Sequence, residues 1–193
     1  MRSRYALVIL DFFNPMDFPG GEALAVASLR AARATARLKA RLQRARVPVI
    51  YANDNFGHWE SEFSALVRRC CGLPGAPGEI ARLLAPGPGD RSILKPRHSA
   101  FYGTPLQFVL DELGTRMLIL TGVSADSCIM ITAHDAHVRK FQVWVPRDCV
   151  AAQKPAYTRE ALAHIERVLS ASIAPSRARL PIARPASRHR QEH

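Results

Sequence analysis

Short apolar runs alternate along this chain with longer segments of helical periodicity, and this alternation restricts the possible folds more than any other feature. The short runs have the length and the β-branched or aromatic content of buried strands, and they occupy residues 5–13, 47–52, 92–95, 115–121 and 142–145. Helical patterns separate them, at residues 23–46, 105–114, 127–140 and 157–172, and one or two helical turns are expected around residues 79–84. Strands that alternate with helices in this way form a parallel sheet with helices on both faces. The sequence therefore predicts an α/β fold.

The length and composition of the chain suit one globular domain. Of its 193 residues, 48% are hydrophobic and 22% are charged. We expect the domain to span residues 1–174 and a basic, flexible tail to occupy residues 175–193, where Pro, Arg and Ser accumulate.

Neither a membrane span nor a secretory signal is expected, because the sequence has no run of about 18 apolar residues and no signal-type cleavage pattern. The cysteines lack the spacing of a disulfide framework, which favours reduced thiols at Cys70, Cys71, Cys128 and Cys149. Both observations predict a cytoplasmic protein.

The formal net charge of +11 is concentrated in two segments. Residues 30–46 contain seven Lys or Arg and no acidic residue, and residues 175–193 contain five Arg and one Glu. The arginines of the first segment recur at helical spacing and indicate the solvated face of an amphipathic helix: Arg30, Arg33, Arg37, Arg41 and Arg44. An acidic partner, such as RNA or a phospholipid surface, is the alternative. No aromatic residue interleaves with these arginines, which disfavours nucleic-acid binding.

Three residues with chemically useful side chains follow predicted strands. Asp11 lies near the end of the first strand, Lys95 ends the third, and Cys128 begins the helix that follows residues 115–121. Ligands of open parallel sheets bind beyond the carboxyl ends of the strands, so these side chains are expected at one edge.

Together, these three groups suffice for nucleophilic acyl transfer. The helix dipole and a nearby ammonium lower the pKa of a thiol, so Cys128 can be a thiolate at neutral pH. Asp11 can take the thiol proton and return it to a leaving amine, while Lys95 supports both charges. Taken singly, each has a structural alternative: the cysteine as a small packed hydrophobe, the aspartate as a turn cap and the lysine as a surface residue.

The surrounding motifs carry a resemblance. In this order along the chain stand ILDFFN, LKPRHSAFYGTPL and LTGVSADSCIMITAHDA. Together they resemble the isochorismatase-like cysteine hydrolase superfamily, which includes nicotinamidases, N-carbamoylsarcosine amidases and ureidoacrylate amidohydrolases. The resemblance extends from Tyr5 to Ser172. It implies a three-layer Rossmann-like fold with a mainly parallel sheet of about six strands and helices on both faces, and a homo-oligomer, either a dimer or a tetramer.

The resemblance also assigns roles within the site. By this resemblance, the family's catalytic aspartate, lysine and nucleophile correspond to Asp11, Lys95 and Cys128. The family's non-prolyl cis peptide corresponds to the bond between Val123 and Ser124. The resemblance therefore implies that the backbone N–H groups of Ser124 and Cys128 are the oxyanion donors. These assignments imply hydrolysis of a small amide or ureido substrate through a thioester on Cys128.

The chain departs from the family pattern at informative positions. Phe13 stands where most members have Gln. Asn55 stands where nicotinamidases have the first metal-binding His, which leaves Asp54 and His58 as an incomplete ligand set. We therefore expect no metal and no cofactor, and nicotinamide is disfavoured as a substrate. True isochorismatases cleave a vinyl ether and do not need the cysteine, so Cys128 favours amide-type hydrolysis.

Aromatic residues on the loops that flank this edge can form a substrate wall. Phe12, Phe56 and Trp59 are the candidates, with Asn53 as the nearest polar side chain and Tyr102 in the third loop. The alternative is that these residues belong to the core or to a subunit interface.

The sequence thus predicts a cytoplasmic cysteine hydrolase that cleaves a C–N bond of a small molecule. The alternative from another functional class is a binding or scaffold protein of the same fold, which uses its Arg-rich helix and tail to hold an anionic partner.

Overall fold

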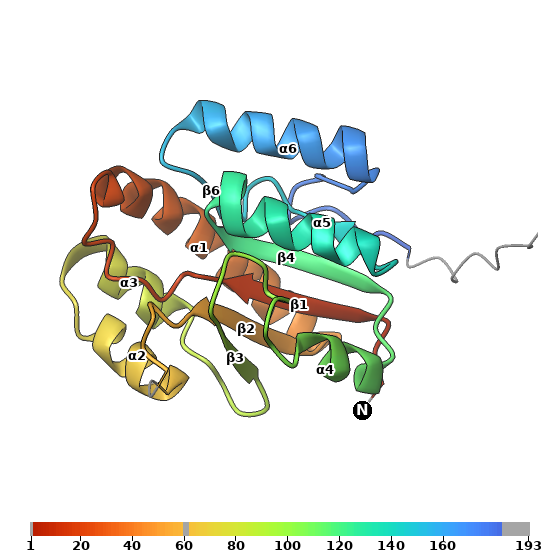
Figure 1. The fold of residues 1–193 in the computed structure, drawn as a ribbon, viewed down its shortest axis with the longest axis horizontal. Helices are drawn as coiled ribbons and strands as arrows, with labels where there is room; N and C mark the ends of the chain where they lie inside the picture. Colours follow the sequence, from red (N-terminus) through yellow and green to blue (C-terminus); the bar gives the residue numbers. More distant parts are fainter. Residues whose placement is uncertain (1, 60–61, 183–193) are drawn as a thin grey trace, which may run out of the picture.

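A parallel sheet forms the centre of the molecule (Figure 1). The computed structural model describes residues 2–59 and 62–182. Within them, six strands pair in the order β3-β2-β1-β4-β5, with β6 beside β4, and every pair is parallel. The strands are β1 (Tyr5–Leu10), β2 (Val49–Asp54), β3 (Arg91–Lys95), β4 (Met117–Val123), β5 (Gln142–Trp144) and β6 (Val150–Ala151). The predicted α/β fold is confirmed.

Helices cover both faces of this sheet and make it the middle of three layers (Figure 1). One hydrophobic core lies under α1 (Gly21–Arg44), α2 (Phe63–Cys71) and α3 (Gly75–Leu83). The opposite core lies under α4 (Leu106–Leu113), the π-helical turn η1 (Ala125–Ile129), α5 (Met130–Val138) and α6 (Pro155–Leu169). Alternate residues of β1 enter opposite cores, as the twofold periodicity of a strand requires.

Several element boundaries differ from the sequence-based expectation. Strand β2 continues to Asp54, because backbone pairing with β3 through Asp54 and Lys95 outweighs the turn preference of its last residues. Helix α3 is longer than the one or two turns expected near residues 79–84, because Pro77 lies in its first turn, where no backbone N–H is needed. Strand β6 was not predicted, since two residues cannot display a periodic pattern.

The segment after residue 174 packs on the domain as far as the structure describes it. The backbone N–H and the hydroxyl of Ser176 both donate to the carboxylate of Asp148, each at 2.7 Å. The Tyr5 hydroxyl donates to the carbonyl of Pro181 at 3.0 Å. For residues 183–193, which lie outside the described residues, the flexible tail stays a prediction.

The basic face of α1 is arranged largely as expected. Arg30, Arg33, Arg37 and Arg44 are exposed. Lys39, from the same basic segment, is instead buried, and its ammonium contacts the Tyr51 hydroxyl and the Asp90 carboxylate, each at 2.7 Å. Within the described residues, no helix is both long and apolar enough to span a membrane.

Candidate active site

Asp11, Lys95 and Cys128 meet at the carboxyl edge of the sheet. The Lys95 Nζ lies 2.9 Å from Asp11 Oδ2 and 3.6 Å from Cys128 Sγ. Asp11 follows β1, Lys95 ends β3, and Cys128 lies in the η1 turn after β4. Three segments that are distant in sequence therefore place a carboxylate, an ammonium and a thiol in mutual contact.

The backbone around Asp11 is held by the neighbouring strand. Asp11 has a φ of 52°, in the left-handed region, and its N–H donates to the carbonyl of Ala52 at 3.3 Å. Its Oδ1 accepts the N–H of Asp54 at 2.7 Å. These bonds fix the carboxylate so that Oδ2 faces Lys95.

The turn that carries Cys128 begins with the predicted cis peptide between Val123 and Ser124. The carbonyl of Ser124 then accepts the N–H groups of Ser127 and Ile129, at 3.2 and 3.1 Å. Gly122, just before the turn, has a φ of 132°, and a Cβ there would lie 2.1 Å from the carbonyl oxygen of Leu10. Only glycine permits β4 to approach β1 this closely.

Burial dominates the electrostatics of the site. It raises the pKa of Asp11, although the Lys95 ammonium opposes the shift. Burial disfavours the charged form of Lys95, but the charges of Asp11 and Cys128 outweigh it and raise the lysine pKa. The Asp11–Lys95 contact is thus a buried ion pair whose carboxylate is a stronger base than an exposed aspartate.

The pKa of the Cys128 thiol is raised in this structure, whereas the helix terminus and the nearby ammonium alone would lower it. Burial, reinforced by the charge of Asp11, raises the pKa of the Cys128 thiol to about 12, against the opposing effect of Lys95. Desolvation of the thiolate outweighs the effects of the helix terminus and the ammonium. A raised thiol pKa favours the thiol at neutral pH, so the nucleophile needs a base to take its proton.

Two further residues lie at the site: Asp54, which the sequence indicated only as part of an incomplete metal-ligand set, and His98, which was not predicted. The Asp54 Oδ2 lies 3.6 Å from Lys95 Nζ, which gives the lysine a second carboxylate. The imidazole of His98 lies with Nδ1 at 3.7 Å from Cys128 Sγ and 3.1 Å from Ser127 Oγ. The available signals were the position of Asp54 after a strand and the position of His98 three residues after the lysine.

The proposed wall residues separate into two groups. Phe56, Trp59 and Tyr102 are 42%, 76% and 63% exposed and line a cavity of about 790 Å³ that His98 also lines. Phe12 and Asn53 are each 1% exposed. Phe12 packs in the core under α1, and the Asn53 amide bonds both backbone groups of Phe13, at 3.0 and 3.1 Å. In this structure these two residues shape the loop and do not face the cavity.

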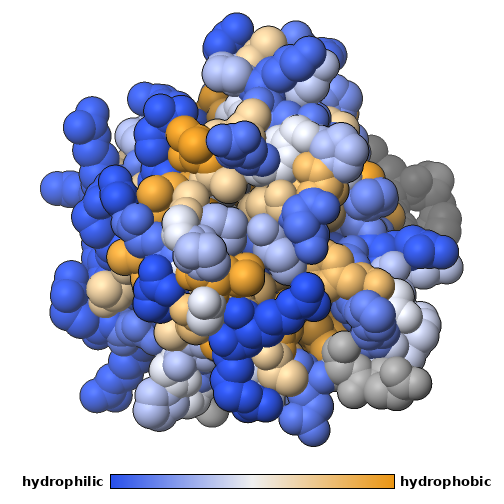
Figure 2. Space-filling view, turned by 90° about the vertical axis from the view of Figure 1, so that its left-hand side faces the viewer, coloured by the Kyte–Doolittle hydropathy of each residue, from blue (hydrophilic) through white to orange (hydrophobic). Residues whose placement is uncertain are grey.

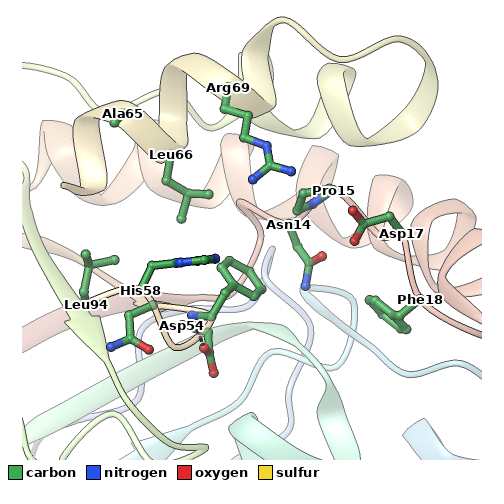
Figure 3. A pocket seen from close by; sticks show the side chains of 12 residues that line it. Asn14, Pro15, Asp17, Phe18, Asp54, His58, Ala65, Leu66, Arg69 and Leu94 are labelled. Atoms are coloured by element: carbon green, nitrogen blue, oxygen red, sulfur yellow. Dashed lines mark hydrogen bonds between the residues drawn. The ribbon is translucent and has the colours of Figure 1, made fainter. Parts of the chain in front are cut away.

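A second cavity, of about 470 Å³, lies between α2 and the loop that contains Asn55 and Phe56 (Figure 3). Arg69 projects from α2 toward Asn14, with Asp17 nearby (Figure 3). Asp54 and Phe56 line both cavities.

Figure 2 shows the molecule from the side at which the strands end, where apolar side chains lie scattered among hydrophilic ones.

The residues in the nicotinamidase metal position do not fit a metal. Asp54 directs Oδ2 to Lys95 and accepts the N–H of Phe56 with Oδ1 at 2.6 Å. The Asn55 Oδ1 accepts the N–H of Gly57 at 2.9 Å. Across residues 2–59 and 62–182, no three His, Cys, Asp or Glu side chains are grouped to hold a metal ion.

Comparison with known proteins identifies the family. A sequence model of the isochorismatase domain matches residues 5–174. The chain is 34% identical over 168 residues to YaaI of Bacillus subtilis, an uncharacterized isochorismatase family protein, covering 87% of this chain and 92% of the relative. It is 39% identical to the ureidoacrylate amidohydrolase RutB of Methylorubrum extorquens over 84 residues, 43% of this chain and 34% of the relative.

A solved structure gives the same result. The N-carbamoylsarcosine amidase of Thermoplasma acidophilum is 25% identical and superimposes with a TM-score of 0.71, over 93% of this chain and 100% of that chain. The family match over nearly the whole length, the shared fold and the site at the carboxyl edge agree. The chain belongs to the isochorismatase-like hydrolase family.

Proposed function

We propose that this protein hydrolyses a carbon–nitrogen bond of a small amide or ureido substrate through a thioester on Cys128. The observation that carries the proposal is the contact of one buried ammonium, that of Lys95, with both Asp11 at 2.9 Å and Cys128 at 3.6 Å. A nucleophile, a base and a cation in contact at one strand edge are the components of covalent acyl transfer.

The first half-reaction uses the buried pair. Asp11, whose pKa is raised by burial, takes the thiol proton while sulfur bonds to the substrate carbonyl carbon. Asp11 then gives that proton to the leaving nitrogen as the C–N bond breaks, and an acyl-Cys128 thioester remains. Lys95 stabilises the thiolate character that develops on sulfur.

The backbone provides the proposed oxyanion site. The N–H groups of Ser124 and Cys128 belong to the turn that opens with the cis peptide and continues into η1. We assign to them the negative charge that develops on the carbonyl oxygen in the tetrahedral intermediate.

The substrate class follows from the relatives and from the cavity. The named relatives act on N-carbamoylsarcosine and ureidoacrylate. Phe56, Trp59 and Tyr102 supply exposed aromatic surface around the cavity that His98, a neighbour of Cys128, also lines. A small ureido or amide compound is therefore the proposed substrate, with no cofactor, in a cytoplasmic homo-oligomer whose four cysteines are unpaired.

A panel assay tests this function. Ammonia release is measured from N-carbamoyl amino acids, small ureas, aliphatic amides and nicotinamide. We expect release from at least one ureido or amide compound, and its loss in Cys128→Ala. Cys71→Ser, which changes a half-buried thiol on α2, is the matched control and should retain turnover. Undiminished turnover by Cys128→Ala would exclude the proposed mechanism.

A further inference from the structure

His98 stands on the open side of the nucleophile. Its imidazole is exposed, lines the 790 Å³ cavity, and directs Nδ1 to within 3.7 Å of Cys128 Sγ. The Ser127 hydroxyl contacts the same nitrogen at 3.1 Å and orients the ring. The thiol therefore lies between a buried ion pair on one side and a solvent-accessible imidazole on the other.

The buried side is poorly placed to receive water. Asp11 is 5% exposed and Lys95 is 0% exposed. The two carboxylate oxygens of Asp11 already face the N–H of Asp54 and the ammonium of Lys95. His98 both lines the cavity and lies within contact distance of the Cys128 sulfur, so water from the cavity can approach an acyl-Cys128 on the side of the imidazole.

We propose that His98 is the general base of the second half-reaction, an inference that rests on the proposed thioester at Cys128. Nδ1 of the neutral imidazole takes a proton from a water molecule as the water oxygen bonds to the thioester carbonyl carbon. The tetrahedral intermediate then breaks its C–S bond, and the departing thiolate receives the proton from the imidazolium of His98. The products are the acid, the free thiol and the neutral imidazole, so atoms and charge balance.

This assignment divides the reaction between two bases. Asp11 moves the thiol proton to the leaving amine during acylation, and His98 moves a water proton to sulfur during deacylation. The 3.7 Å separation of Nδ1 and Sγ permits that last transfer once the ring or the thiol makes a small adjustment. Loss of His98 should therefore slow deacylation and leave acylation intact.

The test uses His98→Asn with p-nitrophenyl acetate as the acyl donor. Asparagine keeps a polar group near the position of Nδ1 and cannot act as the base. Because phenolate needs no proton to leave, the p-nitrophenolate burst reports acylation and the following steady rate reports deacylation. We expect a burst close to that of the parent protein, a steady rate lower by about 10²–10⁴-fold, and an accumulated acetyl adduct in intact-mass spectra.

Controls separate this role from a structural one. His137→Asn changes an exposed histidine at the end of α5 and should leave both phases unchanged. Added imidazole should restore the steady rate of His98→Asn without changing its burst. An unchanged steady rate in His98→Asn, or a slowed burst with no adduct, would overturn the assignment.

Failure of the underlying function gives a different result. If the parent protein forms no acetyl adduct, or Cys128→Ala still forms one at the same site, the thioester mechanism itself fails. If the parent adduct forms on Cys128 and turns over equally fast without His98, only the role of His98 fails.

Discussion

At the residue scale, Lys95 determines whether the site can exist. Its ammonium is completely buried and faces Asp11 at 2.9 Å, Asp54 at 3.6 Å and the carbonyl of Arg97 at 3.2 Å. A buried charge is tolerated only when it is paired and hydrogen-bonded. Lys95 thus connects the segment after β1 with the end of β2 at the point where the chemistry is proposed.

Removing this ammonium should damage both stability and activity. We predict that Lys95→Met lowers the free energy of unfolding by about 3–5 kcal/mol, because it leaves buried Asp11 without its cation. Turnover should also be lost. Urea denaturation and the ammonia assay measure the two effects.

Lys39→Met provides the matched control. This variant removes the other buried lysine, whose ammonium lies 2.7 Å from the carboxylate of Asp90. Because that ion pair is not part of the site, the variant should lower stability and leave turnover of the folded protein intact. The double variant Asp11→Asn with Lys95→Met should recover part of the lost stability and none of the activity. A Lys95→Met variant as stable as the parent would contradict this account.

The raised pKa of Asp11 predicts the acid limb of activity. Asp11 must be ionised to accept the thiol proton, so kcat/KM should fall as the pH decreases through a value above the ordinary aspartate pKa of 3.8. The pKa of the Cys128 thiol, raised to about 12, lies far above this acid limb, so ionisation of the thiol does not contribute to it.

The raised pKa of Asp11 also makes the stability of the fold depend on pH. Asp11 binds its proton more tightly in the folded state than in the unfolded state, so its contribution favours folding at low pH. That contribution is lost as the pH rises through the folded pKa.

A pH profile of kcat/KM that stays flat down to the ordinary aspartate range would show that Asp11 is not the base.

The sequence predicted the three reactive residues because strand ends in a parallel sheet meet at one edge. It gave the wrong direction for the pKa shift of Cys128, since desolvation depends on packing that no local pattern displays. Phe12 and Asn53 were misplaced for the same reason, because an aromatic or amide on a loop can face either the core or the cavity.

At the element scale, the close approach of β1 and β4 positions the nucleophile turn. Gly122 pairs with Leu10 in β1 and with Val150 in β6. An added Cβ would lie 2.1 Å from the Leu10 carbonyl oxygen, and backbone on both sides prevents relaxation.

Gly122→Ala should therefore destabilise the protein strongly. We expect a loss of more than about 4 kcal/mol in the free energy of unfolding, or a failure to fold, because the backbone of β4 must move away from β1. Gly89→Ala is the control: its φ is 85° but no atom lies within 4 Å of an added Cβ, so only the left-handed conformation costs about 1–2 kcal/mol. Equal losses in the two variants would contradict the steric argument.

Most strands and helices were predicted in place, and length did not decide how closely their bounds agree. Strands β3 and β5 match the predicted residues 92–95 and 142–145 to within one residue, and α1 and β4 match to within two at each end. Helix α1 and strands β1 and β4 have enough residues to display their periodicity in sequence. The end of β2 and the whole of β6 depend on backbone pairing with distant strands, which single-sequence patterns do not contain.

At the scale of the whole molecule, the site exists only in the complete fold. Its residues come from the carboxyl ends of β1, β2 and β3 and from the turn after β4. Exposed aromatic side chains surround the cavity: Trp59 and Tyr102 are 76% and 63% exposed. Apolar surface of this kind at a cavity mouth suits contact with a second subunit.

We predict that the protein is a homo-oligomer in solution. Light scattering after size-exclusion chromatography should give a molar mass of two or four times 21.3 kDa. If Trp59 lies in the interface, Trp59→Ser should shift the equilibrium toward smaller species. A mass of 21.3 kDa at assay concentration would show that one chain forms the complete site.

The most direct test of the central claim is to trap the acyl intermediate. The reaction with a turned-over amide or ureido substrate is quenched in acid, digested and mapped by mass spectrometry. The account predicts an acyl group on Cys128, released by hydroxylamine, and none on Cys70, Cys71 or Cys149. Turnover that proceeds with no adduct on Cys128, and that persists in Cys128→Ala, would contradict it.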